Sequence, residues 1–477
     1  MGGNLYLLSI IIALPFLGML FVLSAKDDDK TGGRNVYNVS LFAVIANIVL
    51  ILRMFSRLNV KSPALQLTER FTWLENPRID IILGVDVFSA LLLLAVHIAF
   101  IIGFMAVRHN RLRQKSMMVF SLLFLSQITG FLLAADIFSF YIFFEAMLFP
   151  VFMLIGIFGD IRRQGTMYRF FLYNFLGAVV LFLATIILYN YQNGAVEISK
   201  VAELSFNSRI EHFMWASILI SFLSRIPVWP FHFWISSVSS SIKNPLVFII
   251  VNLIPLTGIY GLIRFLPQTF PPSAAFYITA LEIIGVVTML FIALIGFINK
   301  DTQYKFFSYI TVYYIMYMLG LLTKNNLIML NVGFSFFSYL IIVAGLEFVS
   351  GYIRVQQEKL ELGTEGLLCP VPRLSFIYSF LVLAAIGLPV SSLFLNNFLI
   401  ISSLLENNFN LGITVVCALV LSSGALLGDL YRLKDSSSFC PDKGCIPDIS
   451  KPYFVFLAFI IFVLIASFVR PLWFLGV

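Results

Sequence analysis

The chain has 477 residues, of which 60% are hydrophobic and 12% are charged, and its mean hydropathy is +0.97. Soluble domains carry roughly a quarter charged residues, so this chain has too few to cover a surface in water. The formal net charge of +7 is not gathered into a basic stripe, which argues against a nucleic-acid-binding protein. The composition therefore predicts an all-α polytopic membrane protein.

Apolar runs long enough to cross a bilayer predict about fourteen transmembrane helices. The first run has no small-residue cleavage site, so we expect a retained span and not a signal peptide. In the first half the spans are predicted at 5–24, 37–56, 82–107, 116–135, 136–158, 167–190 and 210–235. In the second half they are predicted at 245–265, 276–299, 305–323, 326–352, 373–404, 410–430 and 452–473.

The loops between these runs are short, so we expect a single membrane domain over residues 1–477. Within it we expect N-terminal helices at 1–115, a first repeat at 116–265, a second repeat at 276–430 and a C-terminal helix at 452–473.

Prolines lie within the seventh predicted span, at Pro227 and Pro230, and within the twelfth, at Pro389. Proline removes a backbone hydrogen bond and clashes with the preceding turn, so both helices are expected to break. Broken helices at corresponding positions of two halves are typical of inverted-repeat transporters with ion sites at mid-membrane. The pattern fits two inverted five-helix repeats, although proline kinks without function are also common in membrane helices.

Ionisable residues inside predicted spans are the candidates for function, because their burial in hydrocarbon is costly. Asp86 and Asp136 lie near span ends, where a helix N-terminus accounts for them as well as function does. His97 is expected to bond a backbone carbonyl, and Asp429 is expected to form a surface ion pair with Arg432 or Lys434. The remaining candidates are Glu145, Arg225, His232, Glu282 and Glu347.

Glu145 lies mid-span among aromatic and aliphatic side chains, so its carboxylate needs a proton or a partner. Arg225, beside the first break, is the cation farthest from any predicted membrane interface. We therefore expect a Glu145–Arg225 ion pair, which is either part of a proton path or a static structural pair.

Several segments together resemble the antiporter-like membrane-arm subunits of respiratory complex I, over roughly residues 80–435. They are 136–159, Tyr168–Tyr173, Pro227–Trp234, Gly258–Arg264 and Ile386–Pro389. The resemblance implies a proton-translocating subunit of NADH:ubiquinone oxidoreductase that is driven by quinone reduction elsewhere. It implies proton-translocating roles for Glu145, Arg225 and His232, and Glu282 and Glu347 are further candidates.

The chain also departs from the family at relay positions. Arg225 stands where the family has a lysine, and arginine does not deprotonate in proteins. The family's eighth-helix lysine falls near Pro255 or Leu256, and its twelfth-helix glutamate corresponds to Asn397. The region of the tenth-helix histidine, 308–314, contains no histidine. Two alternatives therefore stay open: a structural subunit with a degenerate channel, and a related cation/proton antiporter subunit.

The resemblance implies that NADH, FMN, iron–sulfur clusters and ubiquinone bind other subunits of the assembly. For this chain we expect no cofactor, redox centre, catalytic residue or metal site. The expected partners are neighbouring antiporter-like subunits and membrane lipids, with no nucleic acid. The expected location is the mitochondrial inner membrane or, alternatively, a bacterial plasma membrane.

The distribution of lysine and arginine predicts the orientation. The odd-numbered loops and adjoining helix ends hold 20 of these residues, and the even-numbered ones with the C-terminal tail hold 10. By the positive-inside rule, loops 108–115, 353–372 and 431–451 share the matrix or cytoplasmic side.

This orientation can be tested with the native thiols of loop 431–451. A membrane-impermeant thiol reagent should label Cys440 and Cys445 only from the matrix or cytoplasmic side. Labelling of both from the opposite side in sealed vesicles would overturn the predicted topology.

Overall fold

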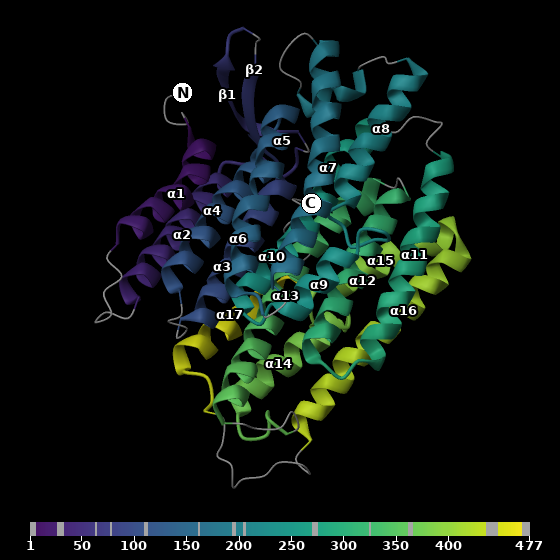
Figure 1. The fold of residues 1–477 in the computed structure, drawn as a ribbon. Coiled ribbons are helices and arrows are strands. Elements are labelled where there is room, and N and C mark those ends of the chain that lie inside the picture. The colour runs from purple at the N-terminus through teal and green to yellow at the C-terminus, as the bar shows by residue number, and fades with distance from the viewer. Residues whose placement is uncertain are drawn as a thin grey trace. The chain divides into compact units, whose positions relative to one another are not determined.

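The computed structural model describes most of the chain, and almost all of that part is helical (Figure 1). The described residues are 6–25, 33–62, 64–76, 79–108, 113–160, 163–192, 197–203, 207–269, 275–323, 326–360, 366–435 and 447–469. Cys440 and Cys445 lie outside this part of the chain.

The helices follow the predicted spans closely in both halves. Up to the first break they are α1 (Leu7–Ser24), α2 (Arg34–Phe55), α3 (Val87–Val107), α4 (Gln114–Leu133), α5 (Ile137–Ala146), α6 (Leu148–Phe158), α7 (Arg163–Gln192), the 3-10 helix η1 (Ile198–Glu203) and α8 (Ser208–Leu223). After it come α9 (Phe233–Ser241), α10 (Pro245–Thr269), α11 (Ala275–Ile298), α12 (Thr302–Leu322), α13 (Asn326–Leu360), α14 (Pro372–Ala385), α15 (Ser392–Asn407), α16 (Phe409–Lys434) and α17 (Lys451–Val469).

Twelve helical segments within the described residues are long and apolar enough to cross a membrane. The predicted spans 210–235 and 373–404 are not among them, because each is divided into two shorter helices: α8 and α9, and α14 and α15. The expected interruptions are therefore present. The number fourteen depends on counting each interrupted pair as one crossing, and it stays a prediction.

A β-hairpin lies where only loop and helix were expected. Strand β1 (Gln66–Leu74) pairs antiparallel with β2 (Ile79–Val85), so the all-α expectation is wrong for this segment. The hairpin also caps a helix: the Glu69 carboxylate accepts hydrogen bonds from the backbone N–H groups of Leu8, at 2.7 Å, and Ser9, at 3.0 Å. These N–H groups have no partner inside α1, so a negative side chain is favourable there.

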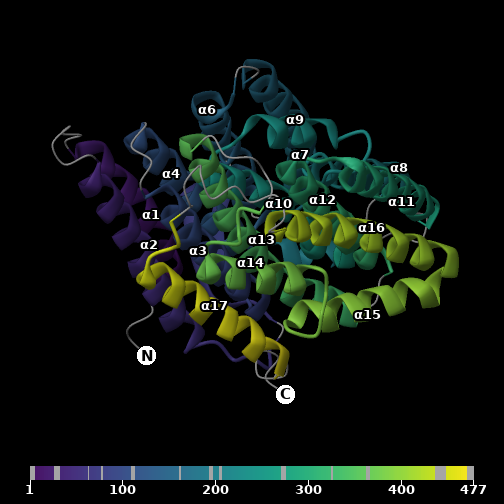
Figure 2. The same ribbon diagram turned by 90° about the horizontal axis from the view of Figure 1, so that it is seen from below.

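The chain forms two compact units. Unit 1 comprises 1–97, 108–242 and 250–283, and unit 2 comprises 98–107, 243–249 and 284–477. Within unit 1, α1 packs against α2 and α4, and α7 packs along α8 (Figure 1). Within unit 2, α15 packs against α13 and α16 (Figure 2). The predicted boundaries of the two repeats stay a prediction.

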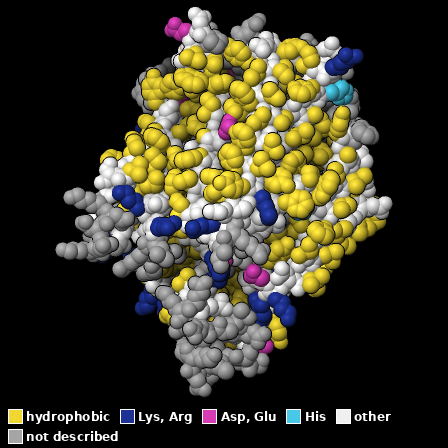
Figure 3. Space-filling view, in the orientation of Figure 1, with side chains coloured by type: hydrophobic (Ala, Val, Ile, Leu, Met, Phe, Trp, Pro, Cys, Tyr) yellow, Lys and Arg dark blue, Asp and Glu magenta, His cyan; other side chains and the backbone are white. Residues whose placement is uncertain are grey.

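Large apolar side chains are exposed along helices of both units. On α7, Phe171, Leu172 and Leu176 are exposed, and on α11 Val287 and Phe291 are exposed. Figure 3 shows one face on which hydrophobic side chains predominate and charged ones are few. An apolar surface of this extent needs lipid or a protein partner to cover it, in agreement with a multi-pass membrane protein.

Two of the expected structural roles for polar residues are confirmed. The Nδ1 atom of His97 lies 2.7 Å from the carbonyl oxygen of Leu93. Asp136 is the N-cap of α5, where its carboxylate accepts from the backbone N–H of Ser139 at 2.8 Å.

Asp86 has a second partner that the sequence did not indicate. It accepts from the backbone N–H of Ser89 at 2.8 Å, as expected near a helix start. Its carboxylate also binds Arg264 of α10 through two hydrogen bonds of 2.6 and 3.0 Å. Arg264 donates in addition to the hydroxyl of Tyr260 at 2.8 Å. This two-pronged ion pair ties the start of α3 to α10 within unit 1.

The Asp86–Arg264 pair predicts a measurable stability effect. Arg264→Gln leaves a buried carboxylate without its cation, so the free energy of unfolding should fall by about 3–5 kcal/mol. The measurement is thermal unfolding of the purified assembly, with Arg53→Gln on the exposed surface of α2 as the control. Equal stability of the two variants would contradict a structural role for the pair.

Candidate functional site

The first helix break, at residues 224–232, forms a series of turns inside unit 1. Pro227 and Pro230 have no backbone N–H, so they cannot continue the helical hydrogen-bond pattern. The indole nitrogen of Trp234 donates to the carbonyl oxygen of Ser224 at 3.1 Å. A backbone carbonyl that the break leaves without a helical partner is thereby satisfied inside the protein, as an apolar environment requires.

Arg225 lies at the start of this break and is completely buried. Its guanidinium donates to the carbonyl oxygen of Phe144 on α5 and, at 3.0 Å, to the hydroxyl of Thr257 on α10. The guanidinium carbon also lies 3.4 Å from the centre of the Phe144 ring, in cation–π contact. In the part of the chain that the structure describes, the buried Nε has no hydrogen-bond partner. Arg225 thus joins three elements of unit 1 at the break.

Glu145 lies beside Arg225 but does not pair with it directly. Its half-buried carboxylate accepts a hydrogen bond from the hydroxyl of Tyr141, one turn earlier on α5. No ion pair with an N–O distance within 4.0 Å joins it to Arg225 in the described part of the chain. The expected direct contact is therefore not formed in this structure. The reason is geometric, because Arg225 uses the backbone carbonyl of the preceding residue, Phe144, and the two charges attract over a longer distance.

His232, at the other end of the break, is nearly buried and lies against the ring of Phe233. Its Nδ1 atom is buried, and no described residue forms a hydrogen bond with it. Within the described residues, no hydrogen bond joins His232 to Glu145 or Arg225. The structure thus places His232 on the same break without bringing it into contact with either charge.

The second break, in unit 2, is lined by neutral polar groups. The carbonyl oxygen of Ala385, at the end of α14, accepts hydrogen bonds from the hydroxyls of Tyr309, at 3.2 Å, and Tyr313, at 2.9 Å. Asn397 of α15 donates to the Tyr313 hydroxyl at 3.0 Å. Sequence reasoning missed this arrangement, although the tyrosine-rich stretch of α12 was a usable signal. The cluster of fully buried tyrosine rings comprises Tyr309, Tyr313, Tyr314, Tyr317 and Tyr339.

Glu282 and Glu347, the two further acidic candidates, have different surroundings. Glu282 is half-buried on α11 and belongs to none of the ion pairs found in the described ranges. Glu347 is almost completely buried on α13, where it forms an ion pair with Arg354 and accepts from the Ser350 hydroxyl at 3.2 Å.

Asp429 pairs with Arg432, as expected, but it is buried and does not lie at the surface. Asp429 is completely buried and accepts from Arg432 at 2.9 Å, from Thr302 at 2.7 Å and from Tyr378 at 2.9 Å. The Lys305 ammonium lies 3.8 Å from the same carboxylate. Asp429 is buried because α12 and α14 pack against this end of α16.

The fold and these sites define a class, an antiporter-like membrane protein with two interrupted helices. The family described as "NADH:quinone oxidoreductase/Mrp antiporter, TM" matches residues 134–422, more than half of the chain. The chain therefore belongs to this family. The matched range contains Glu145, Arg225 and both helix breaks.

Curated relatives cover most of the chain. It is 25% identical over 438 residues to NADH-quinone oxidoreductase subunit M of Rickettsia prowazekii, covering 90% of this chain and 87% of that protein. It is 24% identical over 439 residues to NADH-ubiquinone oxidoreductase chain 4 of Marchantia polymorpha, covering 89% of this chain and 85% of that protein.

Two solved structures share the fold. A chain of respiratory complex I from Thermus thermophilus with bound NADH matches with a TM-score of 0.85 at 18% identity, covering 98% of this chain and 96% of that one. A chain of the membrane-bound sulfane sulfur reductase, an archaeal respiratory membrane complex, matches with a TM-score of 0.79 at 15% identity, covering 97% and 75%.

The contacts of Arg225 predict that a fixed positive charge is needed at the break. Arg225→Lys keeps the charge and should retain most of the proton translocation of the assembly. Arg225→Met keeps the bulk without the charge and should lose translocation through this subunit. The comparison is made at matched levels of assembled complex in vesicles. Equal translocation by both variants would show that the charge is not required.

Proposed function

We propose that this chain is a proton-translocating, antiporter-like subunit in the membrane arm of an NADH:quinone oxidoreductase. The energy comes from quinone reduction in other subunits, which also hold NADH, FMN, the iron–sulfur clusters and ubiquinone. Neighbouring antiporter-like subunits are its partners. Its membrane is the mitochondrial inner membrane or a bacterial plasma membrane.

The proposal rests on the buried charge of Arg225 at a broken helix. Arg225 donates to the carbonyl oxygen of Phe144, which is the residue before Glu145. A buried cation in a membrane span is expensive and is a mark of function. The break supplies polar backbone groups in the apolar interior, which are needed along a path for protons. Glu145 is the group that gains and loses the proton, and Arg225 is the fixed charge that influences it.

The electrostatic magnitudes fit this role. Moving one charge across 100 mV costs about 2.3 kcal/mol. Two unit charges about 8 Å apart, in an effective dielectric of about 20, interact by about 2 kcal/mol. A change in the separation of Arg225 and Glu145 therefore alters the energy of the Glu145 carboxylate by an amount comparable to the work of translocation.

A structural subunit with a degenerate channel is the second candidate. The neutral second break favours it, because tyrosine, serine and asparagine take the place of titratable groups there. The third candidate is a cation/proton antiporter subunit outside an oxidoreductase. Such a subunit would purify without a quinone-reducing assembly. The proposed function requires the chain to purify with a quinone-reducing assembly.

Glu145→Gln tests the proposal directly, because it keeps the shape of the side chain and removes its titration. The variant assembly should reduce quinone but pump fewer protons per electron pair than the wild type. Glu75→Gln, at an exposed position after β1, is the matched control and should pump at the full ratio. A full ratio in the assembled Glu145→Gln variant would favour the structural subunit instead.

A further inference from the structure

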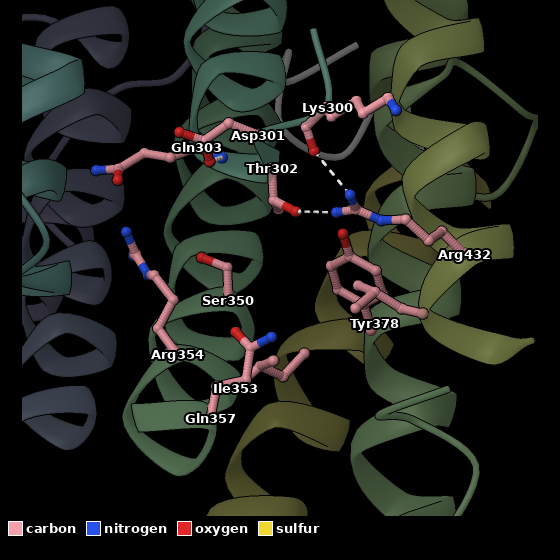
Figure 4. A pocket seen from close by; sticks show the side chains of 11 residues that line it. Lys300, Asp301, Thr302, Gln303, Ser350, Ile353, Arg354, Gln357, Tyr378 and Arg432 are labelled. Carbon is pink, nitrogen blue, oxygen red and sulfur yellow. Dashed lines mark hydrogen bonds between the residues drawn. The ribbon is translucent and has the colours of Figure 1, made fainter. Parts of the chain in front are cut away.

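A polar pocket lies within unit 2, where the ends of several helices meet (Figure 4). Its volume is about 120 Å³, enough for several water molecules. We call it the arginine pocket. Its walls include Lys300, Thr302, Ser350, Arg354, Tyr378 and Arg432.

Glu347 lies directly behind one wall of the arginine pocket. Ser350 and Arg354 line the pocket, and both hydrogen-bond to the Glu347 carboxylate. Glu347 itself is only 1% exposed. It lies within the candidate span 331–357, and two side chains, Ser350 and Arg354, separate its carboxylate from the polar pocket.

Arg354 uses only part of its hydrogen-bonding capacity in this ion pair. Its Nη2 atom donates to Glu347, whereas its Nε and Nη1 atoms are buried without a partner among the described residues. A buried donor without a partner is costly, and ordered water is the usual way in which such donors are satisfied. The guanidinium is therefore placed to exchange between the carboxylate and water in the pocket.

Asp429, which bonds to the lining residues Thr302, Tyr378 and Arg432, provides a contrast. Three donors, from Arg432, Thr302 and Tyr378, hold its carboxylate, and Lys305 lies close by. Such complete pairing suits a structural clamp between helices. Among the described residues, Glu347 is paired with one cation, Arg354, and one hydroxyl, that of Ser350. Losing the cation leaves its carboxylate free to bind a proton.

We propose that Glu347 is a proton-loading group of unit 2 that exchanges protons with water through the arginine pocket. Hydronium transfers one proton to the carboxylate, which leaves a neutral carboxyl group and a water molecule. Arg354 then loses its charged acceptor and turns toward the pocket, and release of the proton reverses both steps. Arg354 is thus a positioning residue. The inference rests on the proposed function and deepens it.

The side of the membrane follows from the elements around the pocket. Thr302 is the first residue of α12, and Lys300 lies two residues before it. Arg354 lies near the end of α13, and Arg432 lies near the end of α16. The loops next to these helix ends are the lysine- and arginine-rich ones predicted on the matrix or cytoplasmic side. Protons therefore reach Glu347 from that side.

Glu347→Gln is the variant that tests this inference, measured in the whole assembly in vesicles. It should lose part of the protons pumped per electron pair while quinone reduction continues. Glu406→Gln, exposed near the end of α15, is the matched control and should show no loss. A full ratio in the assembled Glu347→Gln variant would overturn the inference.

Arg354→Gln is the second variant, for use if Glu347→Gln fails to assemble. Without its cation Glu347 stays protonated, so the same partial loss is expected, and a full ratio again counts against the inference. An independent readout is the infrared difference spectrum between low and high pH. The wild type should show a carboxyl band that Glu347→Gln lacks, and identical spectra would contradict proton loading.

The results also separate this inference from the proposed function. A reduced ratio in Glu145→Gln with a full ratio in Glu347→Gln removes only the role of Glu347. Full ratios in both variants remove the proposed function as well.

Discussion

The pairing of polar groups inside an apolar environment is the constraint on which the rest of this structure depends. Hydrocarbon offers no hydrogen bonds, so each backbone carbonyl that a helix break releases needs a partner in the protein. At the first break the indole of Trp234 donates to the carbonyl oxygen of Ser224. At the second, the hydroxyls of Tyr309 and Tyr313 donate to the carbonyl oxygen of Ala385. Both breaks can therefore persist inside a membrane domain.

The two breaks differ in the charge of the groups that satisfy this constraint. The first holds a buried cation, Arg225, with its donors shared between a backbone carbonyl and a threonine hydroxyl. The second holds hydroxyl and amide groups. Among the described residues of unit 2, the buried charges lie elsewhere, in the Glu347–Arg354 pair and around Asp429. If unit 2 carries protons, its titrating group is thus on α13 and not at the break. The chain can thus belong to an antiporter family although residues 308–314 contain no histidine and Asn397 stands where the family has a glutamate.

Local patterns in the sequence were sufficient for the spans and the breaks. A long apolar run predicts a membrane helix. A proline near its middle favours an interruption but does not always produce one, because α1 continues through Pro15 and α10 through Pro255. The carbonyl bond of His97 could also be predicted, because it is made within one helical turn. The hairpin formed by β1 and β2 was missed because the apolar strand β2 overlaps the predicted span 82–107 and was read as the start of that helix.

Contacts between distant residues could not be predicted in the same way. Asp86 and Arg264 are far apart in the chain, and only the packing of α3 against α10 brings them together. Asp429 looked like a surface residue because it lies near the end of α16, but two other helices bury it. The direct Glu145–Arg225 pair was inferred from the need of each charge for a partner. The structure meets that need with Tyr141 for the acid and with Phe144 and Thr257 for the base.

The most direct test of the account is a density map of the whole assembly in which ordered water is visible. Proton translocation through both units requires water at two places, beside Glu145 and Arg225 at the first break and in the pocket between Arg354 and Tyr378. Water chains that reach Glu145 and Glu347 are the predicted result. A dry, closely packed environment around both acids, in every state of the working assembly, would contradict proton translocation by this chain.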